Sequence, residues 1–223
     1  MVAVVPARGG STGFPGKNLA PFLGTPLVAV AVAAALHADV DTVLVSTDDE
    51  RIGTVARAAG ATVINRPAAL AGPTSRSVSA VLHAVADEPD DTVVVLLQPT
   101  SPLRTGDDVR KCLLLHGNRP TGSVVQVAER AGHHPWKACV LVNGVLAPAR
   151  EWADLEAPRQ VLPPVLQPTG GVYVVSAGDL RAHGRFFVPD VLAQVVPAAR
   201  AIDIDGPADL VLAERTAAEL GWV

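Results

Sequence analysis

A glycine-rich loop near the start of the sequence is the clearest candidate for ligand chemistry. It covers residues 6–18 and reads Pro-Ala-Arg-Gly-Gly-Ser-Thr-Gly-Phe-Pro-Gly-Lys-Asn, directly after an apolar run. Its glycines allow the backbone to approach a ligand and to turn amide groups toward it, and Arg8 and Lys17 add positive charge. This combination predicts binding of an anion, most simply a polyphosphate. A plain surface loop is the weaker alternative, because such a loop needs neither cation.

A pair of carboxylates forms the second candidate site. Residues 202–207 read Ile-Asp-Ile-Asp-Gly-Pro. In an extended strand alternate side chains share a face, so Asp203 and Asp205 are expected to lie side by side. Two such carboxylates repel each other unless a cation lies between them, and their oxygen atoms suit Mg²⁺. The alternative is that Asp205 caps the helix that begins near Pro207, which leaves Asp203 without a role.

A proline-rich segment with two hydroxyl groups follows a predicted buried strand. It reads Leu-Leu-Gln-Pro-Thr-Ser-Pro-Leu-Arg over residues 96–104. Gln98 and Thr100 are expected at the carboxyl edge of the sheet, where the first loop also lies and where ligands bind in open α/β sheets. The same residue types fit a rigid turn equally well.

Two pairs of adjacent ring side chains carry less information. His133 and His134 precede a proline, but adjacent side chains rarely converge on one metal ion and no supporting motif accompanies them. They are interpreted as surface or interface histidines. Phe186 and Phe187 either pack in the core or form the wall of a pocket.

The elements that would hold these residues alternate between strand and helix. Short β-branched runs, typical of strands buried on both faces of a parallel sheet, occupy residues 2–5, 42–45, 61–64, 92–97 and 123–127. Helices are predicted between them over residues 27–37, 50–59, from 75 or 77 to 86, and up to 116. Thr25 is the expected cap of the first, and Thr105 with Asp108 forms a capping box for the last. The alternation predicts an α/β three-layer fold with a mostly parallel sheet and right-handed crossovers.

The regular pattern is interrupted between residues 129 and 168. Asn143-Gly144 predicts a type I′ hairpin that joins residues 137–142 to residues 145–147. Strands are expected again at 171–175 and 201–204, and Gly206-Pro207 starts a helix over 208–220. We therefore predict a single domain over residues 1–223, with an inserted segment over approximately residues 129–168.

Composition excludes several classes of function. The 18 basic and 22 acidic residues give a net charge of −4, no basic run exists, and only 4% of residues are aromatic, so no nucleic-acid partner is expected. No membrane partner is expected either, because the longest apolar stretch, residues 26–36, is too short to cross a bilayer. The start of the chain lacks the features of a signal peptide. The two cysteines are interpreted as buried free thiols, which fits a cytoplasmic protein.

In chain order, these segments resemble the N-acylneuraminate cytidylyltransferases, also called CMP-sialic acid synthetases. The resemblance covers nearly the whole chain. Its motifs are Pro6-Ala-Arg-Gly-Gly-Ser11, Pro15-Gly-Lys-Asn-Leu19, Val45-Ser-Thr-Asp48, Arg66-Pro67, Leu97-Gln-Pro-Thr-Ser-Pro-Leu-Arg104, His133-His-Pro-Trp-Lys137, Pro158-Arg-Gln160, Gly170-Gly-Val-Tyr173 and Ile202-Asp-Ile-Asp205. The first loop alone indicates only a sugar nucleotidyltransferase, whereas the segment that starts at Leu97 and the Asp-Ile-Asp segment make the resemblance more specific.

The resemblance implies a Rossmann-like nucleotidyltransferase that uses Mg²⁺ to transfer CMP from CTP to a nine-carbon keto sugar acid. It also implies a homodimer whose dimerisation element is the inserted segment. The nucleotide would contact Ala7, Arg8, Gly9, Gly10, Ser11, Lys17, Asn18, Arg66 and Ser77. The sugar acid would contact Gln98, Thr100, Lys137, Arg159, Tyr173, Phe186 and Phe187, with the phenylalanines beside its N-acyl group. Asp203 and Asp205 would bind the metal and, with Arg8 and Lys17, form the catalytic set.

Two positions depart from the resembled family. Thr12 stands where the family loop usually has a lysine, and Thr169 stands where an asparagine often precedes the glycine. Three alternative functions follow. The first is the same transfer to another acid, such as an eight-carbon keto sugar acid or a phosphonate. The second is a nucleotide-binding protein without catalysis. The third, a dinucleotide-dependent oxidoreductase, lacks its glycine fingerprint, and the first loop is not a P-loop either.

Overall fold

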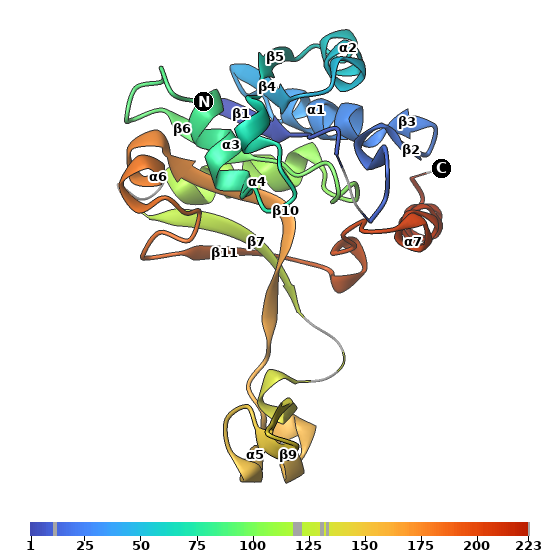
Figure 1. Ribbon diagram of the computed structural model, residues 1–223, viewed down its shortest axis with the longest axis vertical. Helices are drawn as coiled ribbons and strands as arrows, with labels where there is room; N and C mark the ends of the chain where they lie inside the picture. The colour runs from blue at the N-terminus through green and yellow to red at the C-terminus, as the bar shows by residue number, and fades with distance from the viewer. Residues whose placement is uncertain (11–12, 118–121, 130–131, 133, 223) are drawn as a thin grey trace.

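A seven-stranded sheet forms the centre of the molecule in this computed structural model, which describes residues 1–10, 13–117, 122–129, 132 and 134–222 (Figure 1). The strands lie in the order β11-β7-β10-β6-β1-β4-β5. Their bounds are β1 Val2–Pro6, β4 Thr42–Thr47, β5 Thr62–Asn65, β6 Val93–Leu96, β7 Ser123–Glu129, β10 Leu166–Ser176 and β11 Leu192–Val196. Neighbours pair in parallel, except that β10 runs antiparallel to β6 and β7. The predicted α/β fold with a mostly parallel sheet is confirmed.

Helices cover both faces of this sheet and give the predicted three layers. The first face packs against α1 (Leu27–His37), α2 (Glu50–Ala58) and α4 (Gly106–Gly117). The opposite face packs against α3 (Ser77–Ala84) and α6 (Ala177–His183). The last helix, α7 (Pro207–Glu219), joins a smaller apolar cluster with the short pair β2 (Pro21–Phe22) and β3 (Thr25–Pro26). Buried alanine and leucine side chains occur in all three clusters, and buried valines occur in the two that flank the sheet.

Side chains cap the starts of α2 and α4, whereas the cap expected at the start of α1 is absent. The Asp49 carboxylate accepts a hydrogen bond from the amide of Arg51 at the start of α2. Thr105 and Asp108 exchange hydrogen bonds in the expected capping box of α4. The prediction of Thr25 as a cap is wrong, because Thr25 pairs with Phe22 in the β2–β3 ladder and α1 begins two residues later without a side-chain cap.

The described residues between β7 and β10, which are 132 and 134–165, form a projection that we call the arm. Figure 1 shows it beyond the end of the sheet, with α5 (Trp152–Glu156) and β9 (Val145–Pro148) at its far end. β9 pairs with β8 (Cys139–Val142), and both turn residues, Asn143 and Gly144, have positive φ angles as a type I′ turn requires. The predicted hairpin is confirmed, although its first strand begins only at residue 139 because residues 135–137 form a 3₁₀ turn.

The structure corrects two further expectations. Residues 201–204 form no strand: they follow a 3₁₀ turn at Ala198–Arg200, and the Ile204 amide donates a hydrogen bond to the Thr100 carbonyl, in the loop after β6, at 2.8 Å. The strand on this side is instead β11, which was not predicted. Cys112 is buried as expected, but Cys139 is exposed on the arm. In the described part of the chain, no helix is both long and apolar enough to cross a membrane.

Candidate active site

The candidate residues meet at one edge of the sheet because of strand direction. Six of the seven strands run in parallel, so their carboxyl ends share this edge. β10 runs the other way and therefore brings its early residues, Thr169 and Gly170, to the same edge. Figure 1 shows the arm leaving the sheet here through β7 and β10.

Three adjoining hollows open at this edge. The central hollow, of about 240 Å³, is lined by Pro6, Arg8, Lys17, Asn18, Arg66, Ser75, Arg76, Ser77, Gln98, Pro99, Thr100, Asp203 and Asp205. The side hollow, of about 450 Å³, is lined by Gln98, Ala128, Glu129, Gln167, Pro168, Thr169, Gly170, Tyr173, Ala198, Ala201 and Asp203. The aromatic hollow, of about 220 Å³, is lined by Arg76, Ser77, Val78, Leu96, Gln98, Tyr173, Arg185, Phe186 and Phe187. Gln98 lines all three, so the hollows adjoin one another around this side chain.

Hydrogen bonds hold the first part of the glycine-rich loop against its neighbours. The Arg8 side chain donates to the Gly72 carbonyl at 2.5 Å, and the side-chain amide of Asn18 donates to the Arg8 carbonyl at 2.9 Å. The Gly9 amide donates to an Asp48 carboxylate oxygen at 2.9 Å. A side chain at position 9 would collide with Asp49, because its Cβ would lie 2.8 Å from the Asp49 Cβ. Ser11 and Thr12 lie outside the described residues.

Lys17 connects the loop to the carboxylate segment. Its ammonium donates to the Ile204 carbonyl at 2.8 Å and lies 3.2 Å from an Asp205 carboxylate oxygen. The Lys17 side chain is only 15% exposed, whereas that of Asp205 is 84% exposed. A cation from residue 17 and a carboxylate from residue 205 therefore share the central hollow, although Asp205 does not follow a strand as the sequence predicted.

Arg66 forms the buried wall of the central hollow. Its guanidinium donates to the Ser46 hydroxyl at 3.1 Å and to the Ser46 carbonyl at 2.6 Å. Burial lowers the pKa of Arg66, the charge of Asp48 opposes this effect, and the nearby Arg8 adds to it. Ser77, at the start of α3, lines the same hollow.

Asp203 and Asp205 flank a fully buried residue, Ile204, and both line the central hollow. Asp203 is exposed by its accessible surface but lies in a concave site, and the partial loss of hydration there raises its pKa. A hydrogen bond from Thr100 opposes this rise, and the negative charge of Asp205 adds to it. The capping alternative for Asp205 is wrong: Asp209 accepts the hydrogen bonds from the amides of residues 205 and 206 at the start of α7.

The two carboxylates suit a Mg²⁺ ion that takes its remaining ligands from water and phosphate, rather than a metal ion held only by protein side chains. Within the described residues, no group of three or more histidine, cysteine or acidic side chains is placed to hold a metal ion. Asp203 and Asp205 interact electrostatically, which is the situation that a shared cation relieves. Mg²⁺ commonly takes one or two protein carboxylates and completes its shell with water and substrate phosphates. The donor set therefore suits this ion in the presence of a phosphorylated ligand.

Gly170 lines the side hollow and packs closely against Gln98. This residue has a φ of +77°, and a Cβ there would lie 2.7 Å from the Gln98 side-chain oxygen. Thr169 is buried beside it, and its hydroxyl lies 2.7 Å from the Gln126 side-chain oxygen. Thr169 thus fills the position at which the resembled family often has asparagine, and its hydroxyl also accepts the Gly171 amide.

The aromatic hollow joins a core residue to an exposed one. Phe186 is buried and Phe187 is 47% exposed, and their rings lie 5.6 Å and 6.0 Å from that of Tyr173 between centroids. Phe186 thus packs in the core and Phe187 forms part of the pocket wall, so each of the two interpretations of the pair applies to one residue. Burial and the charge of Asp203 raise the pKa of Tyr173, so its hydroxyl stays protonated at neutral pH.

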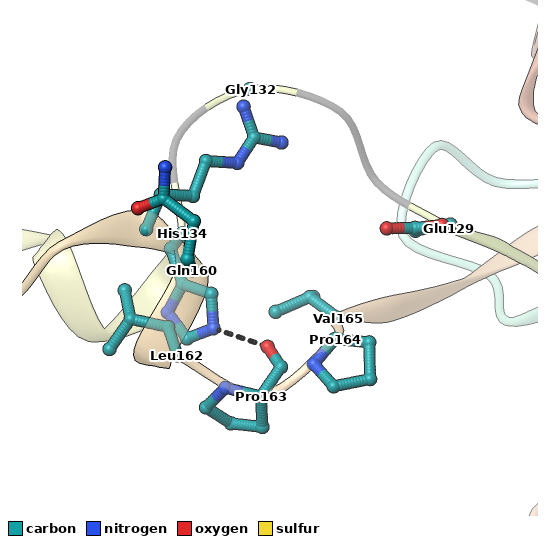
Figure 2. Close-up of a pocket in the computed structure, with 9 residues that line it drawn as sticks. Glu129, Gly132, His134, Gln160, Leu162, Pro163, Pro164 and Val165 are labelled. Atoms are coloured by element: carbon teal, nitrogen blue, oxygen red, sulfur yellow. Dashed lines mark hydrogen bonds between the residues drawn. The ribbon is translucent and has the colours of Figure 1, made fainter.

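The structure does not bring Lys137 and Arg159 to these hollows within one chain. Both lie on the arm, where the Lys137 ammonium donates to the Leu155 carbonyl at 3.3 Å. Arg159 lines a separate hollow of about 370 Å³ on the arm, shown in Figure 2, which shares only Glu129 with the hollows at the sheet edge. His134 stabilises this part: it caps the 3₁₀ turn through the Trp136 amide, and its other ring nitrogen lies 3.0 Å from the Pro163 carbonyl. His133 lies outside the described residues.

Two arginines that were not among the predicted site residues support or line the site. Arg104 is buried, with a pKa lowered to about 10 by burial against the opposing charge of Asp108, and it donates to the carbonyls of Gln98 and Gly171. Arg76 lines both the central and the aromatic hollow. A basic residue directly before a predicted helix at the carboxyl edge of the sheet is the signal that could have identified Arg76.

A parallel sheet whose carboxyl edge joins a cationic glycine-rich loop to a carboxylate pair is typical of α/β enzymes that act on nucleotides. The model of the Cytidylyltransferase family matches residues 2–135. The chain belongs to this family and is a nucleotidyltransferase.

Individual relatives agree with this assignment. The chain is 31% identical to the CMP-N,N'-diacetyllegionaminic acid synthase of Legionella pneumophila, over 96% of this chain and 95% of that protein. It is 26% identical to the N-acylneuraminate cytidylyltransferase of Streptococcus agalactiae, over 94% of this chain and 51% of that protein, so it spans about half of that relative. These relatives confirm the resemblance to the CMP-sialic acid synthetases.

Two further matches concern a different named acceptor. A 3-deoxy-manno-octulosonate cytidylyltransferase from Anaeromyxobacter is 44% identical over 105 residues, which are 46% of this chain and 41% of that protein. The solved structure of CMP:2-keto-3-deoxy-manno-octonic acid synthetase complexed with CTP has a TM-score of 0.73 at 21% identity and covers 98% of each chain. That structural likeness confirms the Rossmann-like fold.

Proposed function

We propose that the protein transfers CMP from CTP to the anomeric hydroxyl of a nine-carbon, N-acylneuraminate-like keto sugar acid and releases pyrophosphate. The observation that carries the proposal is that the three hollows adjoin: Gln98 lines all of them, and Asp203 lines the central and side hollows. This arrangement allows a nucleotide among the cations of the central hollow to meet an acceptor beside Tyr173. The names of the relatives support an acidic sugar as the acceptor.

The proposed reaction depends on positioning and charge neutralisation. The anomeric oxygen attacks the α-phosphorus, a new P–O bond forms, and the bond to the β-phosphate oxygen breaks with pyrophosphate as the leaving group. Arg8, Lys17 and the loop amides offset the charge of the leaving group. The hydroxyl proton passes to a carboxylate of the Asp203–Asp205 pair or to water. Asp203 and Asp205 would hold Mg²⁺, which supplies further neutralisation of phosphate charge when bound.

The aromatic hollow supports an acceptor with an N-acyl substituent. Phe187 presents an exposed ring face next to Tyr173, and an acyl methyl group can pack against such a surface. Gln98 offers one amide donor and one carbonyl acceptor to the sugar hydroxyls from the centre of the site. An eight-carbon acid without an N-acyl group is the alternative, and the partial match to the octulosonate enzyme favours it.

We further propose that the enzyme is a homodimer in which the arm completes the neighbouring site. Lys137 and Arg159 suit the acceptor carboxylate by charge, and an arginine fork binds a carboxylate in a bidentate manner. Since both lie on the arm and outside the hollows of their own chain, a second chain would have to present them. Exposed apolar side chains on the arm, including Leu141 and Trp152, support a surface that is covered in an assembly.

Pyrophosphate release by the purified protein tests the proposal. Each of the four nucleoside triphosphates is supplied with Mg²⁺ and with N-acetylneuraminate, an N,N'-diacetyl nine-carbon acid, an eight-carbon keto sugar acid or a phosphonate. We expect release only with CTP, with the highest kcat/KM for a nine-carbon N-acyl acceptor. A preference for the eight-carbon acid or the phosphonate would replace the proposed acceptor, and CTP binding without release would support the non-catalytic alternative.

A further inference from the structure

Arg76 lies where the central hollow meets the aromatic hollow. It lines both, as do Ser77 and Gln98, but it alone among these three carries a charge. Its backbone is fixed directly before α3, because the Ser79 amide donates to the Arg76 carbonyl at 3.1 Å. The base of the side chain is therefore held at the boundary between the two hollows, while the side chain itself is exposed.

The other cations that line the central hollow already have protein partners. Arg8 donates to the Gly72 carbonyl, Lys17 to the Ile204 carbonyl and Asp205, and Arg66 to Ser46. In the part of the chain that the structure describes, the Arg76 guanidinium makes no hydrogen bond or ion pair. Arg76 can therefore bind an anion without giving up an existing contact.

The sequence of the first loop adds an independent reason to expect a cation from another element. Thr12 stands where the resembled family usually has lysine, so the loop itself has one charge fewer to offer a triphosphate. Arg104 is not the replacement: its guanidinium is buried against the carbonyls of Gln98 and Gly171, and Arg104 does not line the central hollow. Arg76 has the charge and the position that Arg104 lacks.

We propose that Arg76 binds the α-phosphoryl group of the nucleotide, the group that is transferred. This inference rests on the proposed placement of CTP in the central hollow and of the acceptor beside Tyr173. With that placement, the α-phosphorus is the atom at which the two substrates meet, and Arg76 borders both hollows. A guanidinium remains charged at any working pH and its fork matches two phosphate oxygens. Arg8 and Lys17 then neutralise the departing pyrophosphate, and Arg76 the phosphoryl group that remains.

The test compares ligands that differ in one phosphate. Dissociation constants of cytidine, CMP and pyrophosphate are measured by calorimetry for the parent protein, Arg76→Ala and Arg76→Lys, together with kcat and KM. Loss of a charged hydrogen bond should weaken CMP binding about 10- to 100-fold in Arg76→Ala. Cytidine and pyrophosphate should bind as they do to the parent, kcat should fall, and Arg76→Lys should recover part of both losses. Arg215→Ala, an exposed change of the same charge on α7, is the control and should bind and react as the parent does.

Other outcomes overturn the assignment in distinguishable ways. Equal weakening of cytidine and CMP in Arg76→Ala would place Arg76 on the base or ribose. Unchanged CMP binding with a raised KM for the acceptor would place it on the sugar. No change in any constant would make Arg76 an ordinary surface residue. A parent protein that binds CMP but does not turn over would contradict the proposed function while the CMP comparison still decides the role of Arg76, and a parent that binds no CMP would contradict both.

Discussion

At the scale of single residues, the buried Ile204 decides how the two carboxylates are presented. Ile204 anchors the segment in the apolar cluster of α7, and its amide and carbonyl are held by Thr100 and Lys17. Asp203 and Asp205 on either side must then project into the central hollow. The geometry thus leaves both carboxylates available to a cation, because Asp209 takes over the capping of α7.

We expect Asp203→Asn and Asp205→Asn to retain the fold and to lose turnover. Removal of a ligand or of its orienting partner at a metal site should reduce activity or metal affinity on the order of 10–100-fold. The measurement is the rate of pyrophosphate release as a function of Mg²⁺ concentration, with thermal unfolding as the check on the fold. Asp209→Ala is the matched control: it should lower stability by about 1 kcal/mol through loss of the cap but keep the Mg²⁺ dependence. Normal Mg²⁺-dependent turnover in both asparagine variants would refute the metal site.

Lys17→Ala should lower kcat more than it weakens CTP binding. Charge on the leaving pyrophosphate grows as the bond breaks, so a cation that faces it contributes more to the transition state than to the ground state. A loss of about 100-fold in kcat is expected from one such group. Steady-state kinetics with varied CTP separate the two effects. If KM for CTP rises while kcat stays at the parental value, Lys17 acts only in ground-state binding.

Site residues that follow strands could be predicted from the sequence, whereas contacts between residues far apart in the chain could not. Arg8 and Gln98 each come two residues after a strand of the sheet, so the carboxyl-edge rule is enough to group them. Asp205 was grouped with them through a predicted strand that the structure does not contain. Arg200 and Asp108 lie 92 residues apart, and no local pattern links them. Their contact depends on how α4 packs beside β11, which a single sequence does not specify.

At the scale of elements, a buried ion pair anchors the segment that carries the carboxylates. Asp108 in α4 binds both terminal nitrogens of Arg200, at 2.8 Å and 3.0 Å, and Arg200 ends the 3₁₀ turn just before Asp203. Asp108 also accepts the Thr105 hydroxyl, so one carboxylate caps α4 and fixes the approach to the site. Burial would raise the pKa of Asp108, but the hydrogen bonds from Arg200 and Thr105 outweigh it and lower the pKa below 3.8.

Asp108→Asn should destabilise the protein and should make its folding stability depend less on pH under acidic conditions. Breaking a buried ion pair costs about 3–5 kcal/mol, and the lower end is expected because Arg200 retains some contact with water. Since the pKa of Asp108 is lower in the folded than in the unfolded state, its stabilisation is present above about pH 4 and is lost as the pH falls through the folded value. Urea unfolding at pH 7 and at pH 3.5 should therefore show a smaller acid loss in the variant. The neighbouring exposed change Asp107→Asn should cost less than about 0.5 kcal/mol, and equal effects of the two would contradict the anchor.

A strand that was predicted but is absent and a strand that is present but was not predicted have one cause. Alternating isoleucine and aspartate at residues 202–205 imitate a strand, so one was predicted over 201–204, yet of the amides at 201–204 only that of Ile204 bonds to a neighbouring loop among the described residues, and no ladder forms. β11, a few residues earlier, does pair along its whole length with β7. Alternation thus shows which side chains share a face, as it does for Asp203 and Asp205, but whether a partner strand lies alongside depends on tertiary packing.

At the scale of the whole molecule, the arm leaves too much apolar surface in water for its size. Two short strands and a five-residue helix cannot bury a core of their own. Their apolar side chains are instead strongly exposed, among them Leu141 at 73%, Val145 at 67%, Trp152 at 61% and Val161 at 70%. A neighbouring chain that covers this surface would also bring Lys137 and Arg159 near a second active site.

The exposed surface and the basic residues of the arm lead us to predict a dimer in which each active site uses residues from both chains. Leu141→Asp should shift the protein from dimer to monomer in light-scattering measurements and should lower turnover without loss of the sheet domain's secondary structure.

A mixing experiment then separates dimerisation from shared sites. Arg159→Ala and Asp205→Asn should each be inactive alone, but a mixed dimer places the intact arm of one chain beside the intact Asp205 of the other. Random exchange of chains should restore about a quarter of parental activity, because about half of the dimers are mixed and each contains one complete site of two. If exchange is verified by tagged chains and no activity returns, the arm serves its own chain or none, and Arg159 has no role across the interface.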